Sequence, residues 1–191
     1  MRENPWRINI YSGYAHYGKL FVERRKRVDG MKLDWLDAEK PLREREKNVA
    51  MDAFDLKWFD EIETKPEDGF FAISGGVIMY FTAEQIKPLF TALAEKFPGG
   101  GIIFDAENQK GVDKSNKVVR KSGNSESLVV LAVDDAEEMF MPWSDRFKRI
   151  TTYATLPEKI NKERKISFIT KFMLKMAFRM GFMKFVEIEF K

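Results

Sequence analysis

The hydrophobic pattern is clearest in the middle of the chain. Residues 70–74 form a short apolar run without alternation, which predicts a central parallel strand covered on both faces. Gly75 and Gly76 follow, and they allow a sharp turn or the close approach of a ligand to the backbone. A second buried strand is predicted at residues 102–106, which end in Asp105-Ala106.

A helix is predicted between these two strands. Thr82 and Gln85 have the spacing of a capping box. Behind them, apolar residues recur at the helical period: Ile86, Leu89, Phe90, Leu93, Ala94 and Phe97. A strand, a glycine turn, a helix and a strand form a βαβ unit of a parallel sheet. Ligands bind such sheets at the carboxyl ends of the strands, where Ser74-Gly75-Gly76 and Asp105 are expected.

The same reasoning gives the remaining elements. Strands are predicted at residues 6–11, 31–36, 48–51, 128–133, 147–153 and 183–190, the last one cleanly alternating and half exposed. Helical segments are predicted at residues 56–62, at 111–123 with a glycine C-cap, from Asp134 onward, and at 157–182 with Gly181 at its end. An α/β protein with a mostly parallel sheet is therefore expected.

The predicted helix at 157–182 combines lysines and arginines with Phe and Met residues. A basic amphipathic helix can lie on an acidic membrane surface or bind a partner. The alternative is that its apolar side packs on the sheet while its lysines are solvated. We expect the packed arrangement.

Composition excludes several classes of function. The 191 residues fit one domain. Lys plus Arg number 33 and Asp plus Glu 30, so a net charge of +3 gives no reason to expect a nucleic-acid partner. The absence of Cys and the single His argue against disulfides, a thiolate or His-based metal site and a Cys nucleophile. No apolar run approaches the roughly twenty residues of a membrane span, and we expect a cytoplasmic protein without a metal or a membrane partner.

Several stretches, in this order, resemble one family of methyltransferases. The matching stretches are residues 27–32, 35–41, 52–55, 58–62, 76–81, 97–100, 103–106, 121–124 and 142–144. Together they resemble the class I, S-adenosylmethionine-dependent family of the tetracenomycin polyketide O-methyltransferase and the leucine carboxyl methyltransferase. The resemblance implies a Rossmann-like fold of seven strands, with helices on both faces and an antiparallel last strand.

The resemblance also implies a donor site. Glu39, with Asp37 nearby, corresponds to the acid that binds the ribose hydroxyls, and a carboxylate can accept both hydroxyl protons. Asp52 and Ala53 correspond to the pair that meets the adenine. Acids after strands also cap helices, which is the structural alternative for these positions.

A substrate pocket would be lined by aromatic side chains. Tyr80 and Trp143 are the candidates, and Phe81 is a further one for which we prefer a place in the core. Packing in the core is the alternative for all three. The resemblance assigns no catalytic side chain, since methyl transfer depends mainly on in-line placement of the acceptor oxygen.

The chain departs from the family at two points. Gly75 stands where the family has a Glu that contacts the donor. The family's glycine-rich turn after its first strand is also missing, so the first part of the domain is expected to be incomplete, with residues 6–11 taking the place of the first, central strand. A sheet without that strand would expose unpaired backbone groups.

Two functions are therefore expected. One is methyl transfer from S-adenosylmethionine to a hydroxyl or carboxyl oxygen of a small, polyketide-type molecule. The other is a non-catalytic methyltransferase-like module for binding or assembly, in which a truncated domain exposes apolar surface and self-associates.

Overall fold

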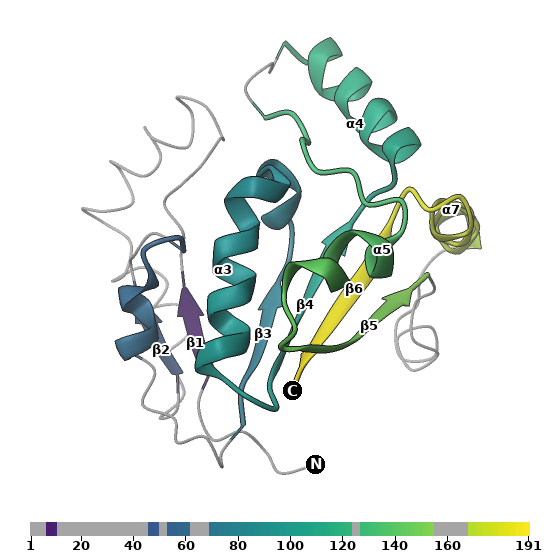
Figure 1. Cartoon of the computed structure of the whole chain (residues 1–191). Coiled ribbons are helices and arrows are strands. Elements are labelled where there is room, and N and C mark those ends of the chain that lie inside the picture. Colours follow the sequence, from purple (N-terminus) through teal and green to yellow (C-terminus); the bar gives the residue numbers. More distant parts are fainter. Residues whose placement is uncertain (1–6, 11–45, 50–52, 62–68, 124–126, 155–167) are drawn as a thin grey trace. The chain divides into compact units, whose positions relative to one another are not determined.

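The computed structural model describes residues 7–10, 46–49, 53–61, 69–123, 127–154 and 168–191 (Figure 1). The chain divides into two compact units, Met1–Phe70 with Asn124–Ser127, and Phe71–Gly123 with Leu128–Lys191. The single domain expected from the chain length stays a prediction.

The first unit contains a short parallel pair of strands. β1 (Arg7–Ile10) pairs with β2 (Glu46–Val49). β1 confirms the strand predicted at 6–11, and β2 begins two residues before the strand predicted at 48–51. The strand predicted at 31–36 lies outside the described residues, and the central position expected for β1 stays a prediction.

A helical turn with two aromatic side chains belongs to the same unit. η1 (Leu56–Glu61) confirms the helical segment predicted at 56–62. Trp58 and Phe59 are buried, and their rings meet edge to face at 4.4 Å between centroids. This geometry is favourable for aromatic pairs.

The second unit is built on a four-stranded sheet in the order β3-β4-β6-β5 (Figure 1). β3 (Phe71–Ser74) and β4 (Gly101–Ala106) are parallel. β6 (Lys184–Phe190) runs antiparallel to β4 and to β5 (Phe147–Tyr153). The parallel βαβ unit and the antiparallel last strand are both confirmed.

The core of this unit lies between the sheet and the helices α3 (Ala83–Lys96) and α5 (Ala136–Phe140). Phe90, Phe104 and Phe140 come from α3, β4 and α5, and their ring centroids are 5.3 to 6.2 Å apart. Every second residue of β6 is buried, because successive side chains of a strand point to opposite faces of the sheet and only one of these faces is fully covered. Phe81, which follows the short helix η3 (Ile78–Tyr80), is 2% exposed, which confirms its place in the core.

Asn108 joins the start of α4 (Gln109–Lys121) to the end of α7 (Phe168–Arg179). Its side-chain oxygen accepts from the Gly111 amide at 2.8 Å and so caps α4. Its side-chain nitrogen donates to the Met180 carbonyl at 2.9 Å, and its backbone amide donates to the Gly181 carbonyl at 3.0 Å. Gly181 has φ +69°, a left-handed conformation that favours glycine at a helix end.

The covered strand predicted at residues 70–74 is wrong in one respect. β3 lies at an edge of the four-stranded sheet, and Ile73 is 80% exposed and Phe71 47% exposed. The helices α3 and α5 cover the other face, so the side chain of Ile73 stays exposed and that of Phe71 is only partly covered. An apolar run without alternation shows only which residues the strand contains. It cannot show whether other segments of the chain pack on both faces of that strand.

The strand predicted at residues 128–133 is also wrong. Only Ala132 forms an isolated parallel bridge, with Glu107. Val129 exchanges two hydrogen bonds with the Asn116 side chain, and the amides of Val130 and Leu131 both donate to the Met79 carbonyl. These partners satisfy the backbone in place of a strand ladder.

The packed arrangement expected for the long basic helix holds for one side only. Phe178 is buried, and its ring lies 6.2 Å from that of Phe185 on β6. Phe172 and Met173 are 59% and 65% exposed, and Met176 and Met180 are exposed as well. α7 is apolar on two sides, and one side suffices to pack on the unit. Residues 155–167 lie outside the described part of the chain.

The capping box of α3 gives a direct test of local stability. Thr82 accepts from the Gln85 amide, and the Gln85 side chain accepts from the Thr82 amide at 2.8 Å. We expect Thr82→Ala to lower the free energy of unfolding by about 1 kcal/mol, measured by urea denaturation. Thr91→Ala, in the middle of the same helix, is the control. Its hydroxyl only bonds back to the carbonyls of Lys87 and Pro88, so an equal loss there would contradict the prediction.

Candidate functional site

The carboxyl ends of β3 and β4 meet at one edge of the sheet because the two strands are parallel and adjacent. The chain turns at Gly75-Gly76 directly after β3. The Gly76 amide donates a hydrogen bond of 2.7 Å to the Asp105 carboxylate near the end of β4. Gly76 has φ +67°, so its backbone conformation favours glycine. This bond fixes the turn on the neighbouring strand.

Gly75 has no such constraint. It is exposed, and nothing lies within 4 Å of the position that a Cβ would occupy. Its φ is not positive. The backbone at Gly75 is therefore open to a ligand, and the space beside it would admit a side chain.

The Met79 carbonyl fixes a second segment next to this turn. It accepts from the Val130 amide at 2.8 Å and the Leu131 amide at 3.0 Å. The Val133 amide donates to the Glu107 carbonyl at 2.8 Å. Residues 128–133 are thus tied both to η3 and to the end of β4.

Glu107 is a half-buried carboxylate just beyond β4. The Ser115 hydroxyl of α4 lies 3.1 and 2.9 Å from its two oxygens. Burial raises the pKa of Glu107 above its ordinary value of 4.5; the Ser115 hydrogen bond opposes this, and the charge of Asp105 adds to it. Sequence reasoning missed Glu107. The usable signal was its place two residues after Asp105, because residues at that spacing in a strand share a face.

Lys184, at the start of β6, is buried and lies close to the start of α4. Its ammonium donates to the Asp134 carbonyl at 2.9 Å, and the Asp134 carboxylate accepts from the Gln109 amide at 3.2 Å. Burial lowers the pKa of Lys184, and the charges of Asp134 and Asp135 partly offset this. The Lys184 amine therefore connects the start of β6 to Asp134, which in turn contacts the start of α4.

The predicted donor-site residues are only partly described. Asp37, Glu39 and Asp52 lie outside the described residues. Ala53 belongs to the first unit, where its carbonyl accepts a hydrogen bond of 2.9 Å from the Trp58 indole. Gly75 belongs to the second unit and lies at the end of β3. The roles assigned to these residues stay predictions.

The two predicted substrate-pocket residues lie in different surroundings. Tyr80 ends η3 and is half-buried next to the Gly75-Gly76 turn in sequence. Trp143 ends η4 (Met141–Trp143), and its ring packs edge to face on Phe140 at 4.7 Å and lies 6.2 Å from Phe90. Both side chains are half-buried, Trp143 against the aromatic rings of the core, and the substrate-pocket role of Tyr80 and Trp143 stays a prediction.

Neither a metal site nor a membrane span is found in the described part of the chain. No three His, Asp or Glu side chains there are grouped as a metal ion requires. Among the same residues, none of the helices has the length and apolar character needed to cross a bilayer.

The two glycines of the turn give a matched pair of variants. We expect Gly76→Ala to lower the free energy of unfolding by about 1 kcal/mol, because an L-residue is strained at this φ. Gly75→Ala should stay within about 0.5 kcal/mol of the wild type, because that position is open and its φ is ordinary. Urea denaturation measures both, and equal effects would contradict the assigned turn.

The raised pKa of Glu107 predicts a pH dependence of stability. The folded state holds this proton more tightly than the unfolded state, so the wild type should lose stability relative to Glu107→Gln as pH rises through and above 4.5. Gln keeps an acceptor for Ser115. Urea denaturation between about pH 4 and pH 7 measures the difference. The exposed Glu137→Gln is the control, and a Glu107→Gln difference that is flat with pH would contradict the prediction.

The chain matches no protein-family model and no curated protein. It is similar in structure to a DUF574 family protein from Streptomyces avermitilis MA-4680, with a TM-score of 0.58 at 11% identity, over 98% of this chain and 76% of that one.

Two methyltransferases are similar at lower scores. Geranyl diphosphate C-methyltransferase from Streptomyces coelicolor A3(2), solved with S-adenosyl-L-homocysteine, has a TM-score of 0.47 at 11% identity, over 96% of this chain and 70% of that one. Phosphoethanolamine N-methyltransferase 2 from Haemonchus contortus, solved with S-adenosylhomocysteine, has a TM-score of 0.48 at 14% identity, over 96% of this chain and 48% of that one. The similarity to the DUF574 family protein bears on the fold alone, which is the mixed α/β fold with a parallel βαβ unit and an antiparallel last strand that the sequence predicts.

Proposed function

We propose that this protein is an S-adenosylmethionine-dependent methyltransferase of the tetracenomycin O-methyltransferase and leucine carboxyl methyltransferase type. The observation that carries the proposal is the Gly75-Gly76 turn, which Asp105 fixes at the carboxyl ends of β3 and β4. Open α/β sheets bind their ligands at this edge. The family resemblance of the sequence and the fold of the second unit support the same assignment.

The open backbone at Gly75 is the feature of this turn that supports the binding of a methyl donor. The backbone at Gly75 has no neighbour within 4 Å of its Cβ position, so a ligand can approach it closely there. The position of Asp105 keeps the adjoining amide occupied and the turn in one conformation. The assignments of Asp37 and Glu39 to the ribose and of Asp52 and Ala53 to the adenine remain part of the proposal.

The reaction needs little from the protein beyond placement. The donor supplies a methyl group already activated on a sulfonium. As the C–S bond breaks, a C–O bond forms to a hydroxyl or carboxyl oxygen of the acceptor, and a hydroxyl acceptor releases its proton to a base or to solvent. The chain contributes orientation of the acceptor, for which we assign Tyr80.

The alternative is a methyltransferase-like module that binds or assembles without turnover. The observation that favours it is Gly75, where the resembling family has a donor-binding Glu. The two proposals differ in one measurable property, because only the enzyme needs the donor and its product to bind.

Isothermal titration with S-adenosylmethionine and S-adenosylhomocysteine tests the proposal. We expect binding to the wild type in the micromolar range and at least about tenfold weaker binding to Asp105→Ala, because the turn loses its anchor. Asp105→Asn keeps an acceptor oxygen for the Gly76 amide and should restore most of the affinity. Asp113→Ala, an exposed carboxylate on α4, is the control. No heat at millimolar donor would reject the enzyme and leave the binding module.

A further inference from the structure

α7 carries an apolar surface that does not pack on its own unit. Phe172, Met176 and Met180 follow each other at intervals of four, so they lie on one side of the helical segment, and the Met180 amide continues the helix by donating to the Met176 carbonyl at 2.9 Å. Met173 borders them, and all four side chains are exposed. We call these four residues the α7 apolar face. Phe178, on the other side, holds the helix to β6.

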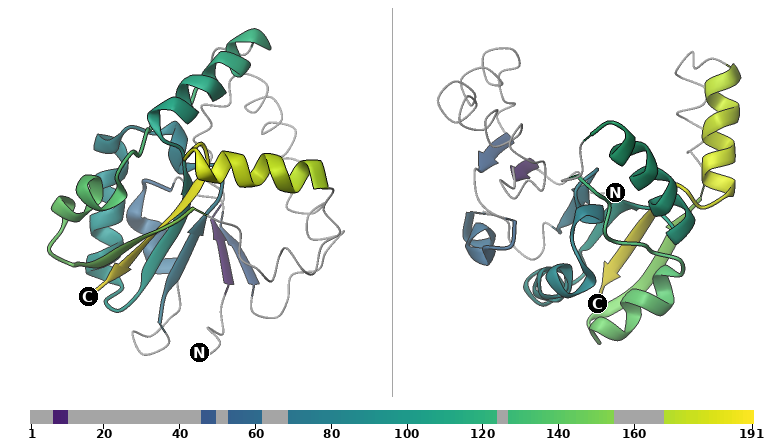
Figure 2. Two further views of the ribbon diagram at one scale, coloured as in Figure 1. Left: turned by 90° about the vertical axis from the view of Figure 1, so that its right-hand side faces the viewer. Right: turned by 90° about the horizontal axis from the view of Figure 1, so that it is seen from above.

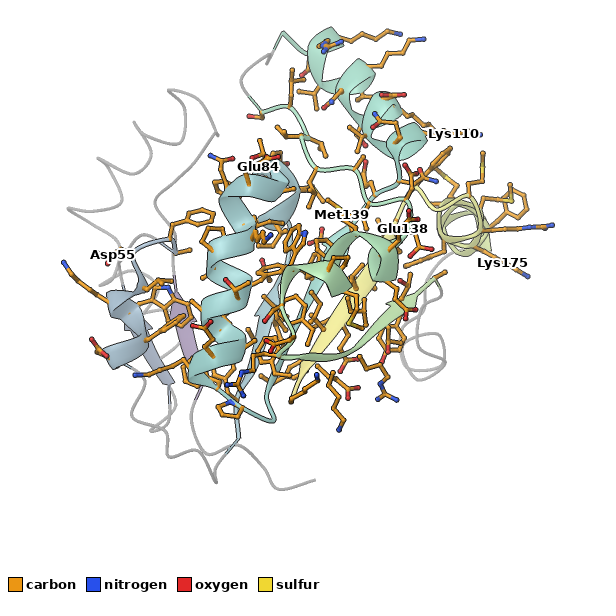
Figure 3. All side chains as sticks on the ribbon, viewed as in Figure 1. Asp55, Glu84, Lys110, Glu138, Met139 and Lys175 are labelled. Atoms are coloured by element: carbon orange, nitrogen blue, oxygen red, sulfur yellow. The ribbon has the colours of Figure 1, made fainter. Side chains whose placement is uncertain are left out.

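Cations flank the α7 apolar face. Lys175 and Arg179 are exposed and lie three residues after Phe172 and Met176 respectively, so each is a neighbour of the apolar side chain before it. The segment Phe168–Arg179 contains no acidic residue. Figure 3 shows Lys175 directed away from the sheet.

α4 extends the positive charge. Asn108 ties the start of α4 to the end of α7, and the Lys114 ammonium lies 4.8 Å from the centre of the Phe182 ring that follows α7. Five exposed cations of α4 stand against one acid, Asp113: Lys110, Lys114, Lys117, Arg120 and Lys121. Four exposed acids lie before or on α5, which packs on the sheet with α3, and the carboxylate of Asp134 is used at the start of α4 by the Gln109 amide: Asp134, Asp135, Glu137 and Glu138.

We propose that the α7 apolar face, with the cations of α7 and α4, docks the protein on an anionic lipid surface. An amphipathic helix with Phe and Met on one side and Lys and Arg beside them lies in the interface of such a membrane. Juxtaposed basic residues add attraction to anionic headgroups. α7 lies at the periphery of its unit in both views of Figure 2. A helix that projects from the surface in this way can lie against a flat lipid interface. The exposure of this face means that the packing on the sheet expected from the sequence holds for the Phe178 side of α7 only.

Co-sedimentation of the full chain with lipid vesicles tests the proposal. We expect binding to phosphatidylcholine vesicles that contain phosphatidylglycerol, weakening as salt is raised, and little binding to pure phosphatidylcholine. Phe172→Ser with Met176→Ser should weaken binding about tenfold or more, and so should Lys175→Glu with Arg179→Glu. All four positions are exposed, so circular dichroism should show an unchanged fold.

A matched pair of charge reversals is the control. Lys87→Glu with Lys148→Glu, on α3 and β5, changes the net charge by the same amount at exposed positions outside α7 and α4 and should preserve most of the binding. Absence of binding to anionic vesicles would overturn the proposal. So would equal losses in the control and the α7 charge pair. A dimer in sedimentation velocity that Phe172→Ser with Met176→Ser dissociates, without vesicle binding, would assign the face to a second copy instead. None of these readings depends on whether the donor binds.

Discussion

The hydrogen bond from the Gly76 amide to the Asp105 carboxylate fixes the turn after β3 on the neighbouring strand β4. It joins residues 29 positions apart and adds to the pairing of β3 with β4 at their carboxyl ends. A carboxylate is a strong acceptor for a backbone amide. Here the Asp105 carboxylate restricts the conformation of the glycine turn by accepting from the Gly76 amide. The ligand site proposed at Gly75 and Tyr80 depends on this turn, because Gly75 belongs to it and Tyr80 follows it on η3.

The segments around this edge are held by side chains and carbonyls of other elements. Asn116 holds Val129, Met79 holds Val130 and Leu131, and Asp134 holds the start of α4. Residues 128–133 therefore have a fixed path without belonging to the sheet. Loops held in this way can position ligand-binding residues as firmly as strands do.

Local patterns in the sequence were enough to predict the elements of the second unit whose determinants are local. The capping box at Thr82, the helical period of α3 and the alternation of β6 each depend on neighbours a few residues away. The exposure of Ile73, the unpaired path of residues 128–133 and the uncovered side of α7 depend on which distant segments lie alongside. The places of Gly75 and Asp105 at the strand ends could be predicted from the order of the strands. The Ser115 hydrogen bond to Glu107 could not, because it depends on how the predicted helix α4 packs beside β4.

The two edge strands of the four-stranded sheet differ in how readily a further strand can pair with them. β5 forms one edge, where the pairing register shifts between Phe147 and Arg149, and the exposed Lys148 occupies the irregularity. Bulges and lysines at an edge discourage a further strand from pairing there. β3 forms the other edge with a regular register and no charged side chain among its four residues. A further strand therefore meets less hindrance beside β3, next to the turn that Asp105 holds, than beside β5.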